Sequence, residues 1–306
     1  MAGARASTVA RQRGVRGVLT TGAVRIDSTG GVSLALHDLG GTGDPLLIAH
    51  ATGFCGRTYE PLAKHLTAVF HVWALDFRGH GDSTAPTNDD FSWSGMGDDA
   101  MAALVVIMAA SRRGADRRVI GFGHSMGGAA LLLAELARPG LLCSAHLYEP
   151  IVPVNAAPLT GSENPLAHAA RRRRSSFPSK AAALERYATR TPLGELRADA
   201  LGAYVEHGFV DRADGAVELK CQPEHEARTF EAEGKLTVDR LGKLHLPTTV
   251  AVGGRTDDQG PAIFAPGVVK AIPGAVLVEY SHVGHFGPLQ DPQTIAEDIV
   301  AASGGR

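Results

Sequence analysis

The chain has few cysteines and no excess charge of either sign. Its 306 residues include three cysteines and 32 acidic against 30 basic residues. An odd number of cysteines at unrelated spacings (Cys55, Cys143 and Cys221) predicts neither a disulfide framework nor a zinc site, and it is typical of a reducing cytoplasm. The net charge of −2 gives no reason to expect nucleic acid or an anionic membrane as a partner.

Long apolar runs and nucleotide-binding motifs are also missing. The longest apolar segment, residues 100–110, is shorter than the roughly 18 residues that a membrane-spanning helix needs, and we expect it to be a buried helix. No G-x-G-x-x-G or phosphate-binding loop occurs between a strand and a helix, so we expect no nucleotide cofactor. Glu224, His225 and Glu226 are adjacent on a predicted helix and cannot converge on one ion, so we expect no metal.

Residues 1–20 carry four arginines, no acidic residue and no apolar core segment. A secretory signal needs such a segment, so we expect a disordered tail here. Apolar residues make up 44% of the chain, enough to bury the core of one large domain.

Strand and helix patterns alternate along residues 21–153 and again along 245–306. Short apolar runs such as 46–49 are typical of buried parallel strands, and amphipathic stretches separate them. This alternation predicts an α/β fold with a doubly wound, mostly parallel sheet. Residues 154–244 are richer in charge and helix formers and show no clear buried strand, so they predict an inserted helical cap. Within it, we expect the arginine run 171–174 to be a solvated face.

The most informative stretch, residues 121–128, reads Gly-Phe-Gly-His-Ser-Met-Gly-Gly. It contains G-x-S-x-G between a strand-like pair, Val119 and Ile120, and a helical pattern at 129–137. Strand, tight turn and helix form the setting of a nucleophile elbow, which exposes the serine hydroxyl beside a helix N-terminus. Ser125 is therefore the candidate nucleophile, and the backbone N–H of Met126 is a candidate oxyanion donor.

A serine hydroxyl needs a base, and the base needs a third group to orient it. His285 follows the last predicted strand, 276–280, and precedes the final helix, 292–302, which places it at the active end of the sheet. His282 lies nearer the end of the strand and is its competitor. We predict that His285 is the base.

Together these motifs resemble those of the α/β-hydrolase superfamily. His50-Ala51-Thr52-Gly53-Phe54 is similar to the H-G-x oxyanion loop of that family, and residues 76–83 are similar to its D-x-R-G-H-G-x-S turn. The resemblance implies the α/β-hydrolase fold, with the N–H of Thr52 as the second oxyanion donor. Ala51 stands where the family usually has glycine, which is a departure in the loop. His50 and the Asp76 turn are expected to be structural.

Two carboxylates are candidates for the acid that orients His285. Asp257 lies just beyond the predicted strand 248–252, where the family most often places its acid. The register is ambiguous, because counting from Gly254 selects Asp257 whereas counting from Gly253 selects Thr256.

Glu149 is the second candidate, and Asp258 ranks behind both. Glu149 ends the strand that follows the nucleophile helix, 24 residues after Ser125. A carboxylate at this buried position is costly unless it meets a partner such as an imidazole N–H. Some members of the superfamily, including lactonases of a fungal macrolactone, take their acid from this strand. We favour Glu149 and leave Asp257 as the alternative.

The predicted function is a cofactor-free serine hydrolase of small or medium apolar esters or lactones. Carbon–carbon bond hydrolysis, perhydrolysis and a non-catalytic ligand-binding protein of the same fold are the alternatives. The expected partner is a small-molecule substrate, and the sequence does not predict an oligomeric state. Candidate substrate contacts, with His207 and Phe209 as further pocket walls, are Phe54, His124, Tyr187 and Tyr204.

Overall fold

The computed structural model describes residues 23–111, 119–255 and 260–304. Its centre is an eight-stranded sheet with the order β1-β2-β4-β3-β5-β6-β10-β11. In chain order the strands are β1 (Val24–Ser28), β2 (Val32–Gly40), β3 (Asp44–Ala49), β4 (Phe70–Asp76), β5 (Val119–His124), β6 (Leu142–Tyr148), β10 (Thr248–Gly253) and β11 (Val276–Tyr280). Only the pairings of β2 with β1 and with β4 are antiparallel, which confirms the predicted doubly wound, mostly parallel sheet.

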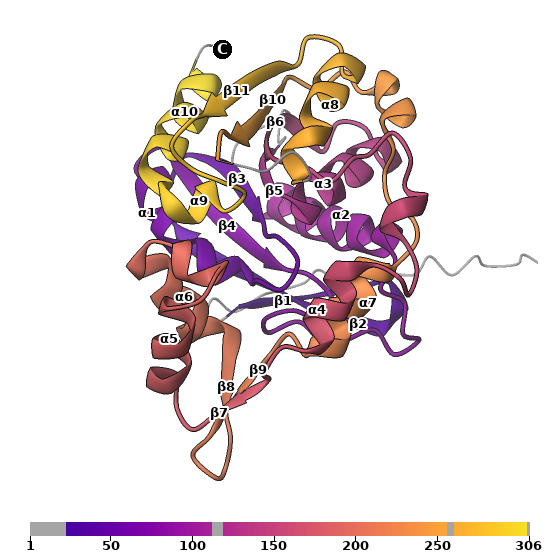
Figure 1. Ribbon diagram of the computed structural model, residues 1–306. Coiled ribbons are helices and arrows are strands. Elements are labelled where there is room, and N and C mark those ends of the chain that lie inside the picture. Colours follow the sequence, from indigo (N-terminus) through magenta and orange to yellow (C-terminus); the bar gives the residue numbers. More distant parts are fainter. Residues whose placement is uncertain (1–22, 112–118, 256–259, 305–306) are drawn as a thin grey trace, which may run out of the picture.

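Helices cover both faces of this sheet (Figure 1). One layer consists of α1 (Glu60–Leu66), α9 (Gly287–Gln290) and α10 (Pro292–Gly304), and the other of α2 (Trp93–Ala110), α3 (Met126–Ala137) and α8 (Ala265–Ala271). The period-2 alternation of β3 explains the two layers. Leu46 and Ile48 pack under the first, whereas Leu47 and Ala49 pack under the second.

Helix α2 contains the apolar segment 100–110, which was predicted to be a buried helix, and extends it toward the N-terminus. It is 18 residues long and, by length and composition alone, apolar enough to cross a membrane. It begins earlier than the sequence suggested, because the Ser92 side chain accepts a hydrogen bond from Gly95 N and caps the helix. Half of it is buried in the fold, where it packs against α3, as the core helix of an α/β domain does.

The chain between β6 and β10 forms a separate group of elements, and we call residues 154–244 the cap segment. It contains four helices, α4 (Pro165–Arg171), α5 (Lys180–Ala188), α6 (Ala198–Gly208) and α7 (Pro223–Glu231). It also holds a small antiparallel sheet of β7 (Ser176–Phe177), β8 (Phe209–Asp211) and β9 (Val217–Leu219). The expectation that this segment lacks strands was therefore wrong. These strands have two or three residues each, too few for an alternating pattern to appear in the sequence.

Candidate active site

Ser125 lies between β5 and α3 in a strained backbone conformation. Its φ of 57° and ψ of −118° are rare for a residue with a side chain and cost about 1–3 kcal/mol. Two backbone hydrogen bonds hold it there: Ser125 N donates to Tyr148 O at 2.9 Å, and Ile151 N donates to Ser125 O at 3.3 Å. The surrounding strands thus fix the elbow that the sequence predicted.

The glycines of the motif are needed for close approach. A Cβ on Gly123 would lie 2.5 Å from the Cα of Gly128, and a Cβ on Gly127 would overlap the carbonyl oxygen of Ala49. The N-terminus of α3 therefore packs directly against the ends of β3 and β5. Only small residues beside Ser125 allow this contact.

Glu149 and His285 meet at the same end of the sheet. The Oε2 atom of Glu149 lies 2.6 Å from the Nδ1 atom of His285. A carboxylate only accepts hydrogen bonds, so Nδ1 carries the proton and Nε2 keeps its lone pair. That lone pair is what a base for Ser125 requires.

The backbone around Glu149 aims its carboxylate. Its φ of 43° turns the chain at the end of β6, and its N–H donates to Ala251 O at 2.8 Å. Its Oε1 atom accepts a hydrogen bond from Gly253 N at 2.9 Å, and the side chain is completely buried. Both carboxylate oxygens are therefore satisfied, one of them by His285. Asp257 and Asp258 lie outside the described residues.

His124, predicted as a substrate contact, is completely buried beside the candidate site. Burial, and then repulsion from the adjacent His285 ring if both rings were protonated, hold the pKa of His124 well below its usual range, so the His124 ring is neutral. Its Nε2 donates to His285 O at 2.8 Å, and its Nδ1 accepts from the Tyr59 hydroxyl at 2.7 Å. Tyr59 in turn accepts a hydrogen bond from Ala51 N. His124 therefore connects the loop of His285 with the loop of Thr52.

The two candidate oxyanion donors are neighbours. The Thr52 hydroxyl lies 3.4 Å from the sulfur of Met126. Met126 is the first residue of α3, so its N–H has no partner within the helix. The loop turns through Gly53, whose φ is 81°, and Phe54 N donates to Ala51 O. The positive φ that this turn requires falls on Gly53, so Ala51 is accommodated where the family has glycine.

Among the residues that the structure describes, no hydrogen bond joins the Ser125 hydroxyl to the His285 ring. Catalytic hydrogen bonds are often long before substrate binds and tighten in the complex. The competitor His282 is half exposed and pairs with Asp291 at 2.7 Å. His50 is buried and accepts from Phe77 N, which fits the structural role expected for it.

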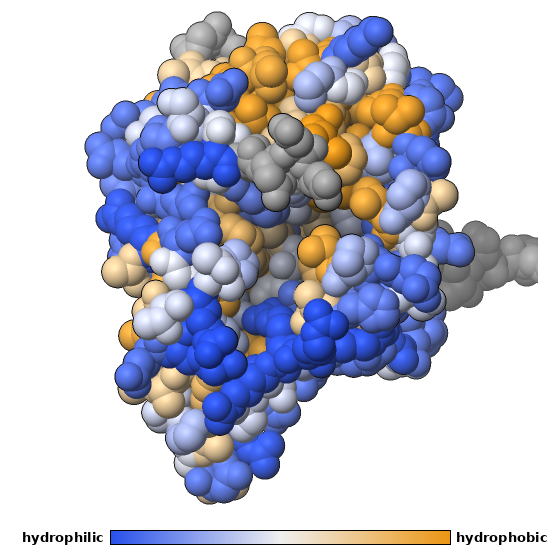
Figure 2. All heavy atoms as spheres, viewed as in Figure 1, coloured by the Kyte–Doolittle hydropathy of each residue, from blue (hydrophilic) through white to orange (hydrophobic). Residues whose placement is uncertain are grey.

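Aromatic side chains join the core to the cap segment beside these loops. The ring of Phe54 lies 5.3 Å from that of Tyr204 and 5.7 Å from that of Phe286, the neighbour of His285. Tyr187, Phe177 and Phe209 pack against one another inside the cap segment, and His207 pairs with Glu60. Phe54 and Tyr204 are thus placed at the boundary, whereas Phe209 belongs to the interior of the cap segment. Figure 2 shows this face of the molecule hollowed between core and cap, with hydrophilic residues along the cap side.

Sequence reasoning missed Arg173. We expected the whole run 171–174 to be solvated, but Arg173 turns inward and contacts Glu226 and Tyr204. The run continues past the end of α4, and consecutive residues at a helix end point in different directions, so not all four could face solvent. This geometry was the signal in the sequence that could have indicated a buried arginine in the run.

Two other clusters of polar residues already have partners within the protein. His37, Asp76 and Asp82 could together approach a cation. However, Asp76 already accepts hydrogen bonds from His37 and from the backbone of Gly56 and Asp82, and Asp82 pairs with Lys220. Glu224, His225 and Glu226 contact three separate partners, namely Arg171, Phe91 and Arg173.

Many solved structures share this fold, and three of them illustrate the likeness. A peroxisomal alpha-beta-hydrolase from Saccharomyces cerevisiae has a TM-score of 0.70 and 16% identity, over 88% of this chain and 80% of its own. An E-2-(acetamidomethylene)succinate hydrolase has a TM-score of 0.70 and 21% identity, over 91% and 97%. An esterase from Rhodococcus sp. has a TM-score of 0.68 and 21% identity, over 92% and 99%. At these identities the likeness establishes the fold alone.

Comparison with curated proteins gives no match. The alpha/beta hydrolase family, by contrast, matches residues 46–298. This match spans most of the chain and includes the elbow at Ser125, the end of β6 at Glu149 and the loop of His285. The chain therefore belongs to the alpha/beta hydrolase family.

Proposed function

We propose that the protein is a serine hydrolase that cleaves an ester or lactone through an acyl-enzyme. The observation that carries the proposal is the pairing of His285 with the buried Glu149 at the sheet end that bears the Ser125 elbow. A nucleophile on a strained turn and a base oriented by a carboxylate form the arrangement that activates a hydroxyl. Asp257 remains the alternative acid in this proposal.

In the proposed mechanism the Ser125 oxygen attacks the acyl carbon, and the lone pair on His285 Nε2 takes the hydroxyl proton. His285 then passes that proton to the leaving oxygen as the carbon–oxygen bond breaks. Water attacks the acyl-enzyme in the same way, with His285 again as the base, and the acid product leaves. Glu149 holds the ring through Nδ1–H and stabilises its charged form in both steps.

The N–H groups of Met126 and Thr52 would stabilise the negative oxygen of each tetrahedral intermediate. Such donors act where charge develops, and loss of one costs about 100- to 1,000-fold in kcat. Support comes from the contact between Thr52 and Met126, which brings the two residues to the same place.

We further propose a cytoplasmic enzyme that acts on a soluble small molecule without a cofactor. The boundary residues Phe54 and Phe286 are aromatic, which suits an acyl or alcohol part of small to medium size. Cys55 and Cys221 are buried free thiols, in keeping with a reducing compartment.

The test is hydrolysis of 4-nitrophenyl butyrate by the wild-type protein and by Ser125→Ala. We expect wild-type turnover and a loss of at least about 10,000-fold in the variant, because no other group supplies the nucleophile. A fluorophosphonate probe should label only the wild type. Circular dichroism should show that both proteins are folded. Turnover that survives Ser125→Ala would refute the proposed nucleophile, and a folded wild type without turnover or labelling would favour a binding protein.

A further inference from the structure

Arg173 connects three parts of the cap segment. It lies two residues beyond the end of α4, its Nη1 atom pairs with Glu226 on α7, and its Nη2 atom donates to the Tyr204 hydroxyl on α6. The side chain of Arg173 is 22% exposed and that of Glu226 is 9% exposed. The guanidinium is therefore fixed in place and largely withdrawn from bulk water.

This cluster lies against the loop that carries the candidate oxyanion donor Thr52. A Cβ on Gly53 would lie 2.5 Å from Glu226 Oε1 and 3.2 Å from Arg173 Nη1. The Tyr204 ring contacts Phe54, the next residue along. Arg173, Glu226 and Tyr204 thus face the loop from the cap side.

The cluster has hydrogen-bond donors to spare. A guanidinium has five N–H groups, and Arg173 uses one on Glu226 and one on Tyr204. Tyr204 accepts from Arg173, so its own O–H proton remains to be donated. No nitrogen of Arg173 is among the described side-chain atoms that are both buried and without a partner. The Nε atom, for which no partner is present among the described residues, therefore reaches accessible space rather than the packed interior.

The other arginines with comparable geometry have no such surplus. Arg78 spends its donors on Asp99, Asp90 and Thr29, and Arg171 spends its donors on Glu224 and Glu231. A desolvated guanidinium with open positions is suited to a planar anion, because a carboxylate accepts two parallel hydrogen bonds from it. Glu226 keeps the guanidinium oriented while its outer edge stays open.

We propose that Arg173 and Tyr204 bind a carboxylate carried by the substrate, with Glu226 as the positioning residue. The inference rests on the proposed hydrolase function and names its substrate class: an ester or lactone that also bears a free carboxylate. With that carboxylate on Arg173, the scissile carbonyl is directed toward the adjacent oxyanion loop. A neutral ester of the same length would lack this anchor.

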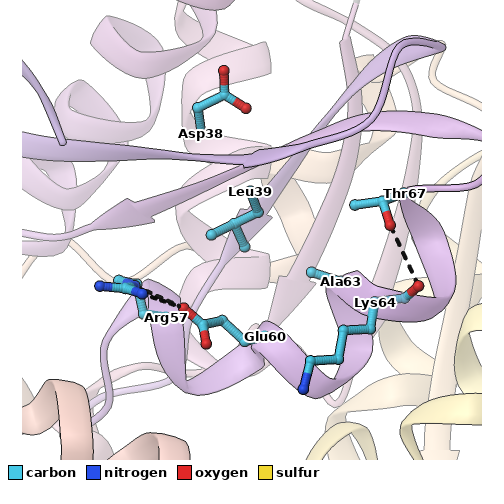
Figure 3. Close-up of a pocket in the computed structure, with 7 residues that line it drawn as sticks. All are labelled: Asp38, Leu39, Arg57, Glu60, Ala63, Lys64 and Thr67. Carbon is cyan, nitrogen blue, oxygen red and sulfur yellow. Dashed lines mark hydrogen bonds and ion pairs between the residues drawn. The ribbon is translucent and has the colours of Figure 1, made fainter. Parts of the chain in front are cut away.

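The surface pocket in Figure 3 offers no comparable site. Its polar residues include Asp38, Arg57, Glu60 and Lys64. Arg57 and Glu60 already pair with each other, and Glu60 also pairs with His207. None of the proposed catalytic residues lines this pocket.

The test compares two substrates that differ by one charge, 4-nitrophenyl hydrogen adipate and its methyl ester. We expect the wild type to prefer the acid. In Arg173→Met, kcat/KM for the acid should fall by about 10- to 100-fold, the range for loss of a hydrogen bond to a charged group. For the methyl ester it should change by less than about threefold. Arg173→Lys should recover part of the loss, and Tyr204→Phe should lower only the rate for the acid.

Other outcomes overturn the inference separately from the hydrolase function. An equal loss for both esters in a folded Arg173→Met would mean that Arg173 only supports the cap segment. A wild type that favours the methyl ester, with no change of preference in the variant, would also refute the anchor. If the wild type hydrolyses neither ester, the proposed function fails. Thermal unfolding with adipate then tests carboxylate binding on its own, because adipate should raise the Tm of the wild type and not that of Arg173→Met.

Discussion

The core and the cap segment hold their charged side chains in opposite ways. In the core, Arg78 and Asp99 pair at 2.8 Å with neither side chain exposed. In the cap segment, Arg171 and Glu224 pair at the same distance with 35% and 49% of their side chains exposed. Desolvated charges need complete partnering, whereas exposed pairs contribute little. Breaking the core pair should therefore cost much stability, whereas breaking the exposed cap pair should cost little.

Arg173 and Glu226 are the instructive exception. They belong to the cap segment by sequence but are mostly buried, as core charges are. Unlike Arg78, Arg173 is not fully partnered by the protein. Arg173 is mostly buried, yet some of its N–H groups have no partner in the part of the protein that the structure describes, and this combination indicates a ligand. Arg171 is more exposed and already paired, so we assign it no such role.

The sharpest test of this comparison removes one charge from each region. Asp99→Asn should lower the free energy of unfolding by about 3–5 kcal/mol, because Arg78 would stay buried with only the more distant and partly exposed Asp90 as a countercharge. Glu231→Gln, which weakens the exposed pairing of Arg171, should cost about 1 kcal/mol or less. Urea unfolding of the two variants measures both. Similar losses of unfolding free energy in the two variants would show that burial does not determine how much an ion pair contributes to stability.

A second test uses pH. His146 on β6 is buried, and burial lowers its pKa to about 4. The unfolded chain takes up this proton near pH 6.5, so below that pH it binds more protons than the folded chain. Stability should therefore fall as the pH drops from 6.5 to 4.

His146→Phe should flatten this fall by up to about 1.4 kcal/mol for each pH unit. Unfolding free energies at several pH values provide the measurement, with the exposed His65 of α1 changed to Phe as the control. The idea would be wrong if both variants kept the wild-type slope.

The smallest expected effect concerns the elbow. Gly127→Ala should destabilise the protein by about 1–3 kcal/mol, because its methyl group would overlap the Ala49 carbonyl. Gly202→Ala, on α6 of the cap segment with open space around it, should be neutral or stabilising by up to about 1 kcal/mol. Thermal unfolding distinguishes them. Equal effects of the two substitutions on Tm would mean that the contact between Gly127 and Ala49 does not exclude a side chain at position 127.

Features of the core that depend on local sequence or on topology could be predicted from the sequence. Ser125 could be placed because its elbow needs glycines at fixed positions, and the parallel sheet follows from strands and helices that alternate along the chain. Glu149 could be proposed because a carboxylate at the end of a buried strand requires a partner. These features are local, or they follow from topology.

The features that could not be predicted depend on packing between distant segments. His124 contacts Tyr59, His285, Tyr148 and Phe286, and no local pattern in the sequence reveals these contacts. The inward turn of Arg173 depends on Glu226, 53 residues away. The cap strands are too short to show a period, and the boundaries of the cap segment stay a prediction.

The most direct test of the central claim is the rate of 4-nitrophenyl butyrate hydrolysis in Glu149→Gln and in Asp257→Asn. Glu149→Gln should lower kcat by about 1,000- to 10,000-fold, because an amide at the Nδ1 side no longer holds the ring in the required protonation state. Asp257→Asn should change kcat by less than about threefold. The reverse order, in two folded variants, would contradict the assignment of Glu149 as the acid that orients His285.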